Sequence, residues 1–208
     1  MYLLIAACVL VFFHMLSLAS LGTMDQFVGT YGVIPAQFTG HLPSAGTTPL
    51  PLRLVTSLFL HGGWLHLAGN MLFLWIFADN VEGAMGHGSF LAFYLLCGVI
   101  ANLAHVIANP LSTEPAIGAS GAIAGVLGGY LLLYPRARVL CLVFLGFFLT
   151  WVWVPAILFL PVWVLLQLAY GVASLGVNQS GGVAWWAHVG GFASGVALVH
   201  VFARQDAA

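Results

Sequence analysis

Long apolar runs, separated by short polar or glycine-rich stretches, fill most of the 208-residue chain. A membrane-spanning helix needs about 20 predominantly apolar residues, and six segments approach or reach this length. The predicted spans are residues 2–21, 64–78, 90–108, 120–133, 156–170 and 187–202. We therefore expect an all-α membrane protein that forms a single domain over residues 1–208, with no soluble accessory domain.

Two of the apolar runs allow more than one interpretation. Residues 2–21 could belong to a signal peptide, but no basic region precedes them and the run is longer than usual, which favours a retained helix. Residues 139–172 exceed one span and contain Pro155 and Pro161, which interrupt helices. We interpret residues 139–154 as an interfacial or re-entrant segment before the fifth span. A hairpin of two short spans is the alternative.

Two connections are long enough to matter for function. Residues 22–52 form a predicted loop rich in Gly, Pro and Thr, and so long a connection is usually functional or disordered. Its several apolar side chains indicate that it lies partly in the membrane interface. A second predicted loop covers residues 171–186 and leads into the last span.

Composition restricts the environment of the chain. Hydrophobic residues make up 62% of the sequence and charged residues 4%, whereas a soluble domain carries about a quarter charged residues. The chain therefore belongs in a lipid bilayer. Its basic residues are four arginines, which excludes the basic patch of a nucleic-acid-binding protein. Three scattered cysteines without CxxC spacing favour neither a disulfide framework nor a zinc site, and we expect no metal.

Six spans would place both termini on the same side of the membrane. Arg136 and Arg138 follow the fourth span and Arg204 follows the sixth, so all three would lie on that side. The positive-inside rule makes it the cytoplasmic side. We expect a multi-pass protein with both termini cytoplasmic, and with Ser120 and the start of the sixth span toward the outer face.

Ser120 opens the fourth predicted span. Free N–H groups and the helix dipole at a helix N-terminus favour a developing negative charge. Serine is also a preferred N-cap residue, and this structural role is the better interpretation of Ser120 taken alone. Gly121, Gly125 and Gly129 follow at intervals of four, a stripe that lets another helix approach closely.

His188 begins the sixth predicted span in similar surroundings. His188, Gly191 and Gly195 share one helix face. A lone histidine in a span is more often a structural group, although an ionisable residue at membrane depth is a functional hypothesis. Packing of the two glycine-lined faces would bring Ser120 and His188 within hydrogen-bond reach, the arrangement of a nucleophile and its base.

The second predicted span carries a further polar group. His66 and Asn70 are four residues apart and share a helix face. Both can donate hydrogen bonds, and a donor aimed at an oxyanion contributes about 3 kcal/mol to catalysis. The structural alternative is polar contact between helices, worth about 0.6–2 kcal/mol. His61 precedes Gly62 and Gly63, and we expect it to hydrate the entrance of the site or to contact the loop.

Three motifs in this order resemble those of the rhomboid family of intramembrane serine proteases. They are an HxxxxHxxxN pattern at His61, His66 and Asn70, a GxSG motif at residues 118–121, and an AHxxGxxxG motif at residues 187–195. The resemblance covers about residues 53–202. Each motif is weak alone, and the three together are specific.

The resemblance implies a six-transmembrane-helix bundle of rhomboid type with a water-filled cavity open to the outer face. Ser120 would be the nucleophile and His188 the base of a dyad without a carboxylate, and His66, Asn70 and the Ser120 N–H would form the oxyanion hole. Gly118, Gly121, Gly125, Gly191, Gly195 and His61 would support the site. No cofactor is expected, the substrates would be transmembrane proteins, and the location would be the cytoplasmic membrane of a prokaryote.

The sequence departs from the family pattern near the dyad. Some rhomboids place a tyrosine four residues after the serine to pack on the histidine, whereas this chain has Ala124 there. The imidazole therefore needs another support. Glu82 follows the second span, and we expect it to pair with Arg136 or Arg138.

Two other functions remain open. Catalytically inactive relatives bind membrane proteins, but they typically lose the serine or histidine, whereas both are present here. A small transporter or channel with a histidine proton path is less favoured, because such proteins often contain inverted repeats and the sequence shows no internal repeat.

Overall fold

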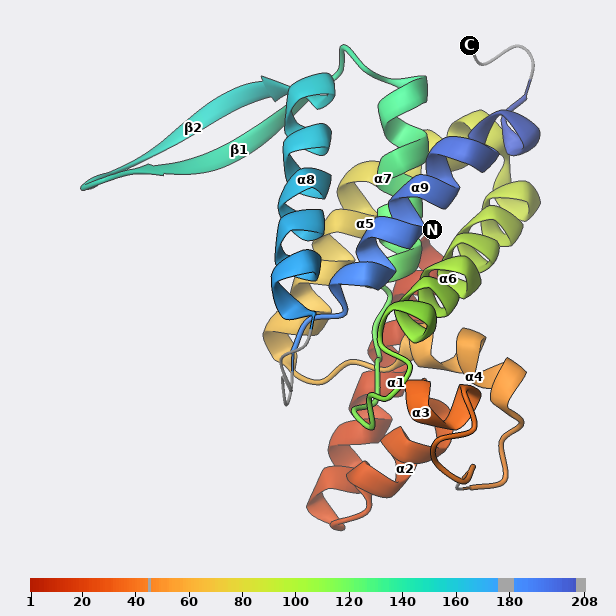
Figure 1. Ribbon diagram of the computed structural model, residues 1–208. Helices are drawn as coiled ribbons and strands as arrows, with labels where there is room; N and C mark the ends of the chain where they lie inside the picture. Colours follow the sequence, from red (N-terminus) through yellow and green to blue (C-terminus); the bar gives the residue numbers. More distant parts are fainter. Residues whose placement is uncertain (45, 176–181, 205–208) are drawn as a thin grey trace.

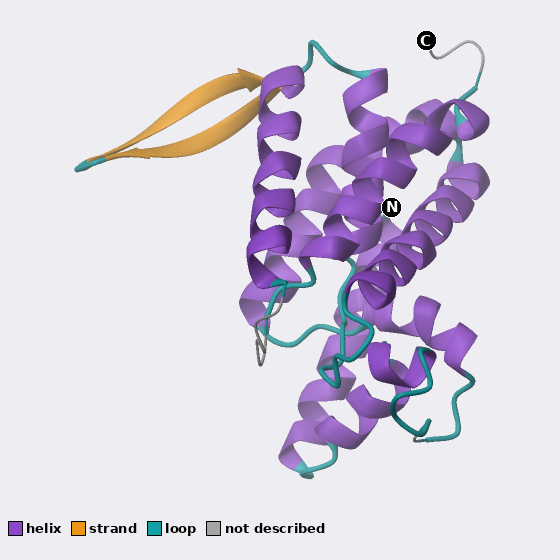
Figure 2. Cartoon of the chain, viewed as in Figure 1, coloured by secondary structure: helices purple, strands orange, loops and turns teal. Residues whose placement is uncertain are grey.

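The computed structural model describes residues 1–44, 46–175 and 182–204, and it is mostly helical (Figure 1). In chain order the helices are α1 (Tyr2–Ser20), α2 (Met24–Tyr31), α3 (Pro35–Phe38), α4 (Leu50–Thr56), a 3-10 turn (Ser57–Phe59), α5 (Trp64–Met85), α6 (His87–Ala108), α7 (Ser120–Leu133), α8 (Ala156–Ser174) and α9 (Trp185–Phe202). Strands β1 (Arg138–Leu145) and β2 (Phe148–Pro155) lie between α7 and α8 (Figure 2).

All six predicted spans are helices in the structure, and most of their bounds agree within three residues. The second differs most, because α5 continues past residue 78 and ends at Gly86. Gly86 has φ of +82°, a conformation that favours glycine and commonly ends helices. Among the described residues, three helices are long and apolar enough to cross a membrane, namely α1, α6 and α8.

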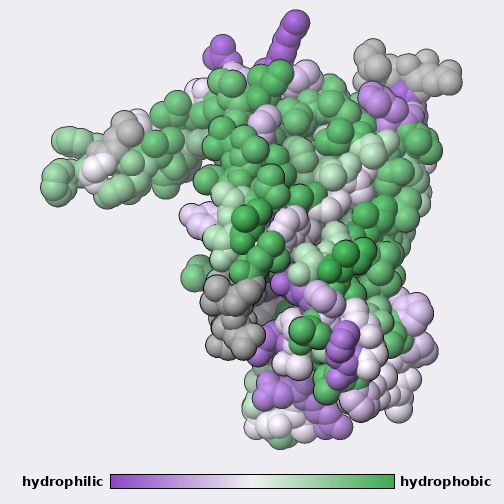
Figure 3. Space-filling model, viewed as in Figure 1, coloured by the Kyte–Doolittle hydropathy of each residue, from purple (hydrophilic) through white to green (hydrophobic). Residues whose placement is uncertain are grey.

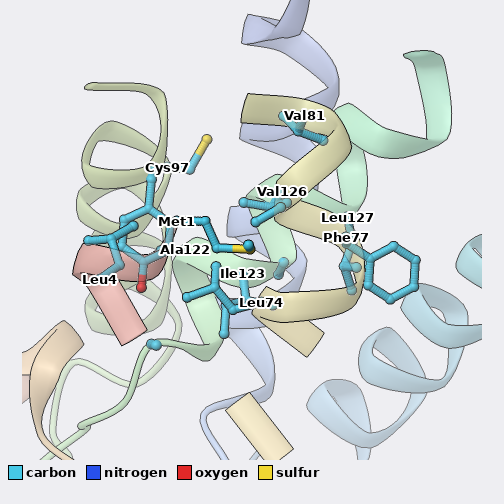
Figure 4. Packing of buried hydrophobic residues seen from close by; sticks show 14 of the residues in the cluster. Met1, Leu4, Leu74, Phe77, Val81, Cys97, Ala122, Ile123, Val126 and Leu127 are labelled. Carbon is cyan, nitrogen blue, oxygen red and sulfur yellow. The ribbon is translucent and has the colours of Figure 1, made fainter. Parts of the chain in front are cut away.

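Helix α7 lies at the centre of the bundle. Every residue from 121 to 130 is buried, as expected for a helix that is apolar on all sides. Its side chains join Leu74 and Phe77 of α5 and Cys97 of α6 in one hydrophobic core (Figure 4). This central position fixes the depth and direction of Ser120 at the start of α7.

The prediction of a loop over residues 22–52 is wrong in part, because α2, α3 and the start of α4 lie within it. Pro35 and Pro51 stand in the first turns of α3 and α4, where proline costs no hydrogen bond. Arg53 of α4 is fully buried and donates hydrogen bonds to the Gly29 carbonyl at 3.1 Å and to Oε1 of Gln37 at 2.6 Å. One arginine thus holds the short helices together.

The all-α expectation is wrong for residues 138–155, because they form an antiparallel β-hairpin. The alternative of two short helical spans in this region is therefore also wrong. Leu142 faces Trp151 and Leu140 faces Trp153 across the two strands. The strands consist largely of β-branched and aromatic residues, which favour strands. Gly146 has φ of +63°, which is the requirement at the first position of a type II′ hairpin turn.

Residues at both ends of the described chain contact the last turn of α5. The Met1 amine bonds Glu82 Oε2 at 2.6 Å, and the Arg204 N–H donates to the Ala84 carbonyl at 3.0 Å. His87 also bonds Glu82, at 2.8 Å. The expected pairing of Glu82 with Arg136 or Arg138 is therefore wrong, and both ends lie on one side of the bundle.

A hydrophobic surface covers the middle of the molecule. In Figure 3 apolar side chains dominate the bundle and the hairpin, whereas hydrophilic side chains gather toward the two ends. Large apolar side chains such as Leu165 and Trp75 are more than half exposed. A large exposed apolar surface of this kind is typical of a protein surrounded by lipid. Residues 176–181 of the predicted loop 171–186 lie outside the described residues. The start of this predicted loop belongs to α8, and its end belongs to α9.

Candidate active site

A non-helical segment enters the bundle before α7 and carries Gly118 and Ala119, both of which are buried. Preceding segments of the chain form hydrogen bonds with its backbone. The Gly118 N–H donates to the Ser57 carbonyl at 2.9 Å, and Val33 and Ala116 form a β-bridge. Irregular backbone at membrane depth is tolerated only where protein surrounds it. Helix α7, with 14 residues, is only about 21 Å long, and Ser120 at its first position is partly buried.

The Ser120 hydroxyl lies 2.8 Å from Nε2 of His188, although the two residues are 68 positions apart. Ser120 is the first residue of α7, and Ala119 takes the N-cap position. The interpretation of Ser120 as an N-cap is therefore wrong. His188 is in the first turns of α9 and is only 8% exposed, so the hydrogen bond is largely shielded from solvent.

Glycines of α7 and α9 let these two helices approach closely. A side-chain carbon on Gly191 would collide with the Gly121 carbonyl and would lie 3.2 Å from Cβ of Ala124, and one on Gly195 would collide with the Gly125 carbonyl. The predicted contact between the two glycine-lined faces is confirmed. Gly125 also faces Cys97 of α6, so its missing side chain accommodates a third helix.

The His188 imidazole is supported by α8 and by its own helix. Nδ1 lies 2.7 Å from Oε1 of Gln167, and the ring of Trp163 lies 5.8 Å from the imidazole. Trp185 contacts the ring edge-to-face at 6.3 Å. Gln167, Trp163 and Trp185 therefore hold the imidazole in place, a task that the small side chain of Ala124 cannot perform.

His66 and Asn70 of α5 converge on Gly118, two residues before Ser120. A side-chain carbon on Gly118 would lie 2.6 Å from Nε2 of His66 and 3.5 Å from Nδ2 of Asn70. Gly118 also has φ of +120°, so glycine is required there for both space and backbone conformation. In the described part of the chain, Nδ2 of Asn70 is buried without a hydrogen-bond partner. This N–H is therefore available to an acceptor that approaches Gly118.

A hydrogen bond from the Gly62 backbone N–H determines which nitrogen of the His66 ring carries the proton. This N–H donates to Nδ1 of His66 over 3.4 Å, so Nδ1 is the acceptor and the ring proton resides on Nε2. Nε2–H is therefore a second donor directed at the space beside Gly118. Together the two α5 side chains offer two N–H groups on the side of Ser120 where the loop enters.

Comparison with known proteins shows the family. The rhomboid domain model matches residues 50–205. The chain belongs to the rhomboid family. It is 34% identical over 143 residues to Rhomboid protease GluP of Bacillus subtilis (strain 168), a match that covers 69% of this chain and 24% of that protein.

Two further relatives agree with this result. Putative rhomboid protease YdcA of the same organism is 39% identical over 79 residues, covering 38% of this chain and 39% of the relative. Presenilin-associated rhomboid-like protein, mitochondrial, of Mus musculus is 29% identical over 151 residues, covering 69% and 36%. The matches thus span only 24–39% of the lengths of these relatives. Family and apolar helices together make this rhomboid an integral membrane protein.

His61 of this rhomboid is fully buried next to His66. The two rings lie 5.1 Å apart, edge to face, and His61 Nδ1 bonds the Phe59 carbonyl at 3.2 Å. Burial lowers the pKa of His61 to about 4, so the ring is neutral at pH 7. His61 therefore packs against His66. Its full burial does not fit the expected role of hydrating the entrance, and its printed hydrogen bond is to Phe59 rather than to the loop of residues 22–52.

Three polar residues near the site were missed by sequence reasoning. Asn102 of α6 donates from Nδ2 to the Leu54 carbonyl at 2.8 Å and to the Ser57 hydroxyl at 2.9 Å. Ser57 in turn holds Gly118 through its carbonyl. Gln167 contacts His188 directly. Gln167 is the one amide within predicted span 156–170, and an isolated polar residue in such a run is the signal that could have identified it.

A pocket of about 800 Å³ opens beside the site. It is lined by the end of α6, the loop of residues 109–116, the end of α8 and residues 182–186. Ser120 and His188 do not line it. The water-filled cavity expected over the dyad therefore stays a prediction.

Proposed function

We propose that this rhomboid is an intramembrane serine protease that hydrolyses peptide bonds in or near transmembrane segments of membrane proteins. The observation that carries the proposal is the Ser120–His188 hydrogen bond of 2.8 Å, beside the unpartnered Asn70 donor. A serine hydroxyl on an imidazole nitrogen is an activated nucleophile. The names of the relatives, rhomboid proteases, agree with this activity.

In the first step Ser120 attacks the carbonyl carbon of the scissile bond. His188 Nε2 accepts the hydroxyl proton as the new C–O bond forms, and the carbonyl oxygen becomes negatively charged. His188 then delivers this proton to the leaving nitrogen, and the C–N bond breaks. The products of this step are an acyl-enzyme on Ser120 and a free amine.

The developing oxyanion would be held by His66, Asn70 and the Ser120 backbone N–H. Nε2–H of His66 and Nδ2 of Asn70 face the space beside Gly118, and the N–H groups of the first turn of a helix have no intrahelical partner. Donors fixed before the reaction stabilise charge without reorganisation. This role explains why Nδ2 of Asn70 is buried without a partner.

Water completes the reaction. His188 removes a proton from a water molecule, which attacks the acyl carbon, and the proton returns to Ser120 as the ester bond breaks. This step requires a path for water to a depth at which lipid would otherwise exclude it. The expected cavity open to the outer face would supply that path.

The proposed orientation follows from charge. We infer six spans, α1 and α5 to α9, with both termini in the cytoplasm of a prokaryotic cell. Arg136, Arg138 and Arg204 follow the ends of α7 and α9, and the positive-inside rule favours these ends on the cytoplasmic side. The site then lies toward the outer face, where a substrate helix would unwind to expose its backbone.

Labelling with a fluorophosphonate probe tests the proposed nucleophile. We expect the purified protein to be labelled at Ser120, and the Ser120→Ala and His188→Ala variants to remain unlabelled while they retain their helical content. A protein that binds membrane helices without cleaving them, or a channel, would not react. Absence of labelling in the folded wild-type protein would therefore contradict the proposal.

A further inference from the structure

Gln167 stands out among the apolar residues of α8. Its side chain is only 8% exposed, and its amide oxygen lies 2.7 Å from Nδ1 of His188. The other nitrogen of the same ring contacts the Ser120 hydroxyl at 2.8 Å. The three side chains form a line from α8 through α9 to α7.

The hydrogen bond to Gln167 determines which nitrogen of the His188 ring carries the proton. An amide oxygen only accepts hydrogen bonds, so Nδ1 of His188 must be the donor. In the neutral imidazole, Nε2 then has a free lone pair and accepts the bond from Ser120. That tautomer is the one a general base requires, and the opposite tautomer would direct an N–H at the hydroxyl.

We propose that Gln167 is a positioning residue that fixes the tautomer and orientation of His188, as the third member of a Ser120–His188–Gln167 arrangement. The inference rests on the proposed protease function for its kinetic consequence. It differs from a Ser-His-Asp triad because the third group is uncharged. A neutral acceptor orients the ring while adding no charge to stabilise the imidazolium.

Among the described neighbours of His188, Gln167 is the residue that accepts a hydrogen bond from Nδ1. Trp163 and Trp185 contact the ring only through their aromatic faces or edges. The titratable neighbours that act electrostatically on His188 are His66 of α5 and His105 of α6. Neither of these forms a hydrogen bond to Nδ1, so removing the Gln167 oxygen leaves that nitrogen without its acceptor.

Two variants separate the hydrogen bond from packing. Gln167→Met keeps the length and approximate volume of the side chain but removes the acceptor. Gln167→Glu keeps an acceptor and cannot donate when ionised, so it also enforces the correct tautomer. Leu166→Ala, on the exposed side of the same helix, is the control for changes of α8 unrelated to His188.

In cleavage of a single-pass model substrate, we expect Gln167→Met to lower kcat by about 10- to 100-fold with little change in KM, because misorientation affects the reaction more than binding. Gln167→Glu should retain activity and shift the acid limb of its kcat–pH profile to higher pH by about one unit, because a carboxylate stabilises the imidazolium. Leu166→Ala should behave as wild type. A Gln167→Met enzyme within twofold of wild type, or an unshifted Gln167→Glu profile, would overturn the inference.

A spectroscopic readout keeps this test separate from the proposed function. The ¹⁵N NMR shifts of the His188 ring report which nitrogen carries the proton, whether or not the protein cleaves anything. We expect Nδ1–H in the wild type and a mixture of tautomers in Gln167→Met. The same tautomer in both would show that Gln167 does not position the ring. If the wild-type protein neither cleaves the substrate nor reacts with the probe, only the proposed protease function is contradicted. The NMR comparison still tests the role of Gln167.

Discussion

At the scale of single residues, Asn70 provides a sharp test of the proposed oxyanion hole. Its Nδ2 is buried without a partner in the described part of the chain, and fold stability alone gives no reason to retain it. Asn70→Ala should lower kcat by about 100- to 1,000-fold while leaving the melting temperature unchanged or slightly higher. His66→Ala should also lower kcat, by at least about tenfold. Kinetics and thermal unfolding in detergent measure both effects.

The control for Asn70→Ala lies on the same helix. Asn80 is exposed, so Asn80→Ala removes an amide of α5 that cannot reach the site. It should leave both kcat and stability near wild type. If Asn70→Ala and His66→Ala lost activity only in proportion to a loss of folded protein, the two residues would be structural contacts between helices.

Ser120, His188, His66 and Asn70 could be named from the sequence because their motifs resemble those of the rhomboid family. Gln167 could not be found in this way. It lies 21 residues before its partner His188, across a connection whose length carries no information on distance. Only the packing of α8 against α9 brings the amide to the ring.

At the scale of elements, the contact between α7 and α9 sets the distance between Ser120 and His188. A side chain on Gly191 would collide with the backbone of α7, so Gly191→Ala must move α9. Overpacking costs about 1–3 kcal/mol, whereas a displacement of about 1 Å can reduce the rate about 100-fold. We expect Gly191→Ala to lose at least tenfold in kcat with a modest loss of thermal stability, and Gly191→Val to lose more of both.

Gly83 provides the matched control for Gly191. It also lies within a helix, but a side-chain carbon there would meet nothing within 4 Å. Gly83→Ala should retain full activity, and its stability should equal or exceed that of wild type because alanine favours helices. A Gly191→Ala enzyme as fast as Gly83→Ala would show that close packing does not set the geometry of the site.

The hairpin β1–β2 is the element that the hydrophobic pattern did not reveal. Alternation of polar and apolar residues marks a strand only when one face meets water. Both faces of this hairpin are apolar, so the pattern is continuous and resembles that of a span. Gly146 and the many β-branched and aromatic residues were the remaining signals, and they do not distinguish a hairpin from a re-entrant segment.

The hairpin should lie in the membrane interface. Leu142 and Trp151 pair on its exposed face and are 53% and 64% exposed, so this face needs lipid. However, the outer edges of a two-stranded sheet have unpaired backbone groups, which hydrocarbon cannot satisfy. Tryptophan is also enriched at the interface. An interfacial position satisfies both requirements.

Spin-label accessibility tests this position. A nitroxide at Leu142→Cys, in a chain with its natural cysteines replaced by alanine, should show oxygen and nickel-complex accessibilities intermediate between two references. The references are Leu165→Cys on the exposed face of α8 and Thr47→Cys in the exposed loop. Values at Leu142 equal to either reference would place the hairpin in hydrocarbon or in water, and would contradict the account.

At the scale of the whole molecule, the predicted apolar runs correspond to the helices, because length and hydrophobicity determine where a chain can cross a bilayer. The short helices between α1 and α5 escaped prediction because their stability depends on tertiary contacts. The buried Arg53 provides several of these contacts. The site joins α5, α7, α8 and α9, so its geometry depends on the complete bundle.

The most direct measurement of the central claim is cleavage of a single-pass model substrate by the purified protein in detergent or lipid. Wild-type protein is compared with Ser120→Ala and His188→Ala, and each variant is first shown to fold by its helical content and thermal unfolding. We predict that the wild type cleaves the substrate and that each substitution abolishes cleavage. Cleavage near the wild-type rate by either folded variant would contradict the assignment of Ser120 as nucleophile and His188 as base.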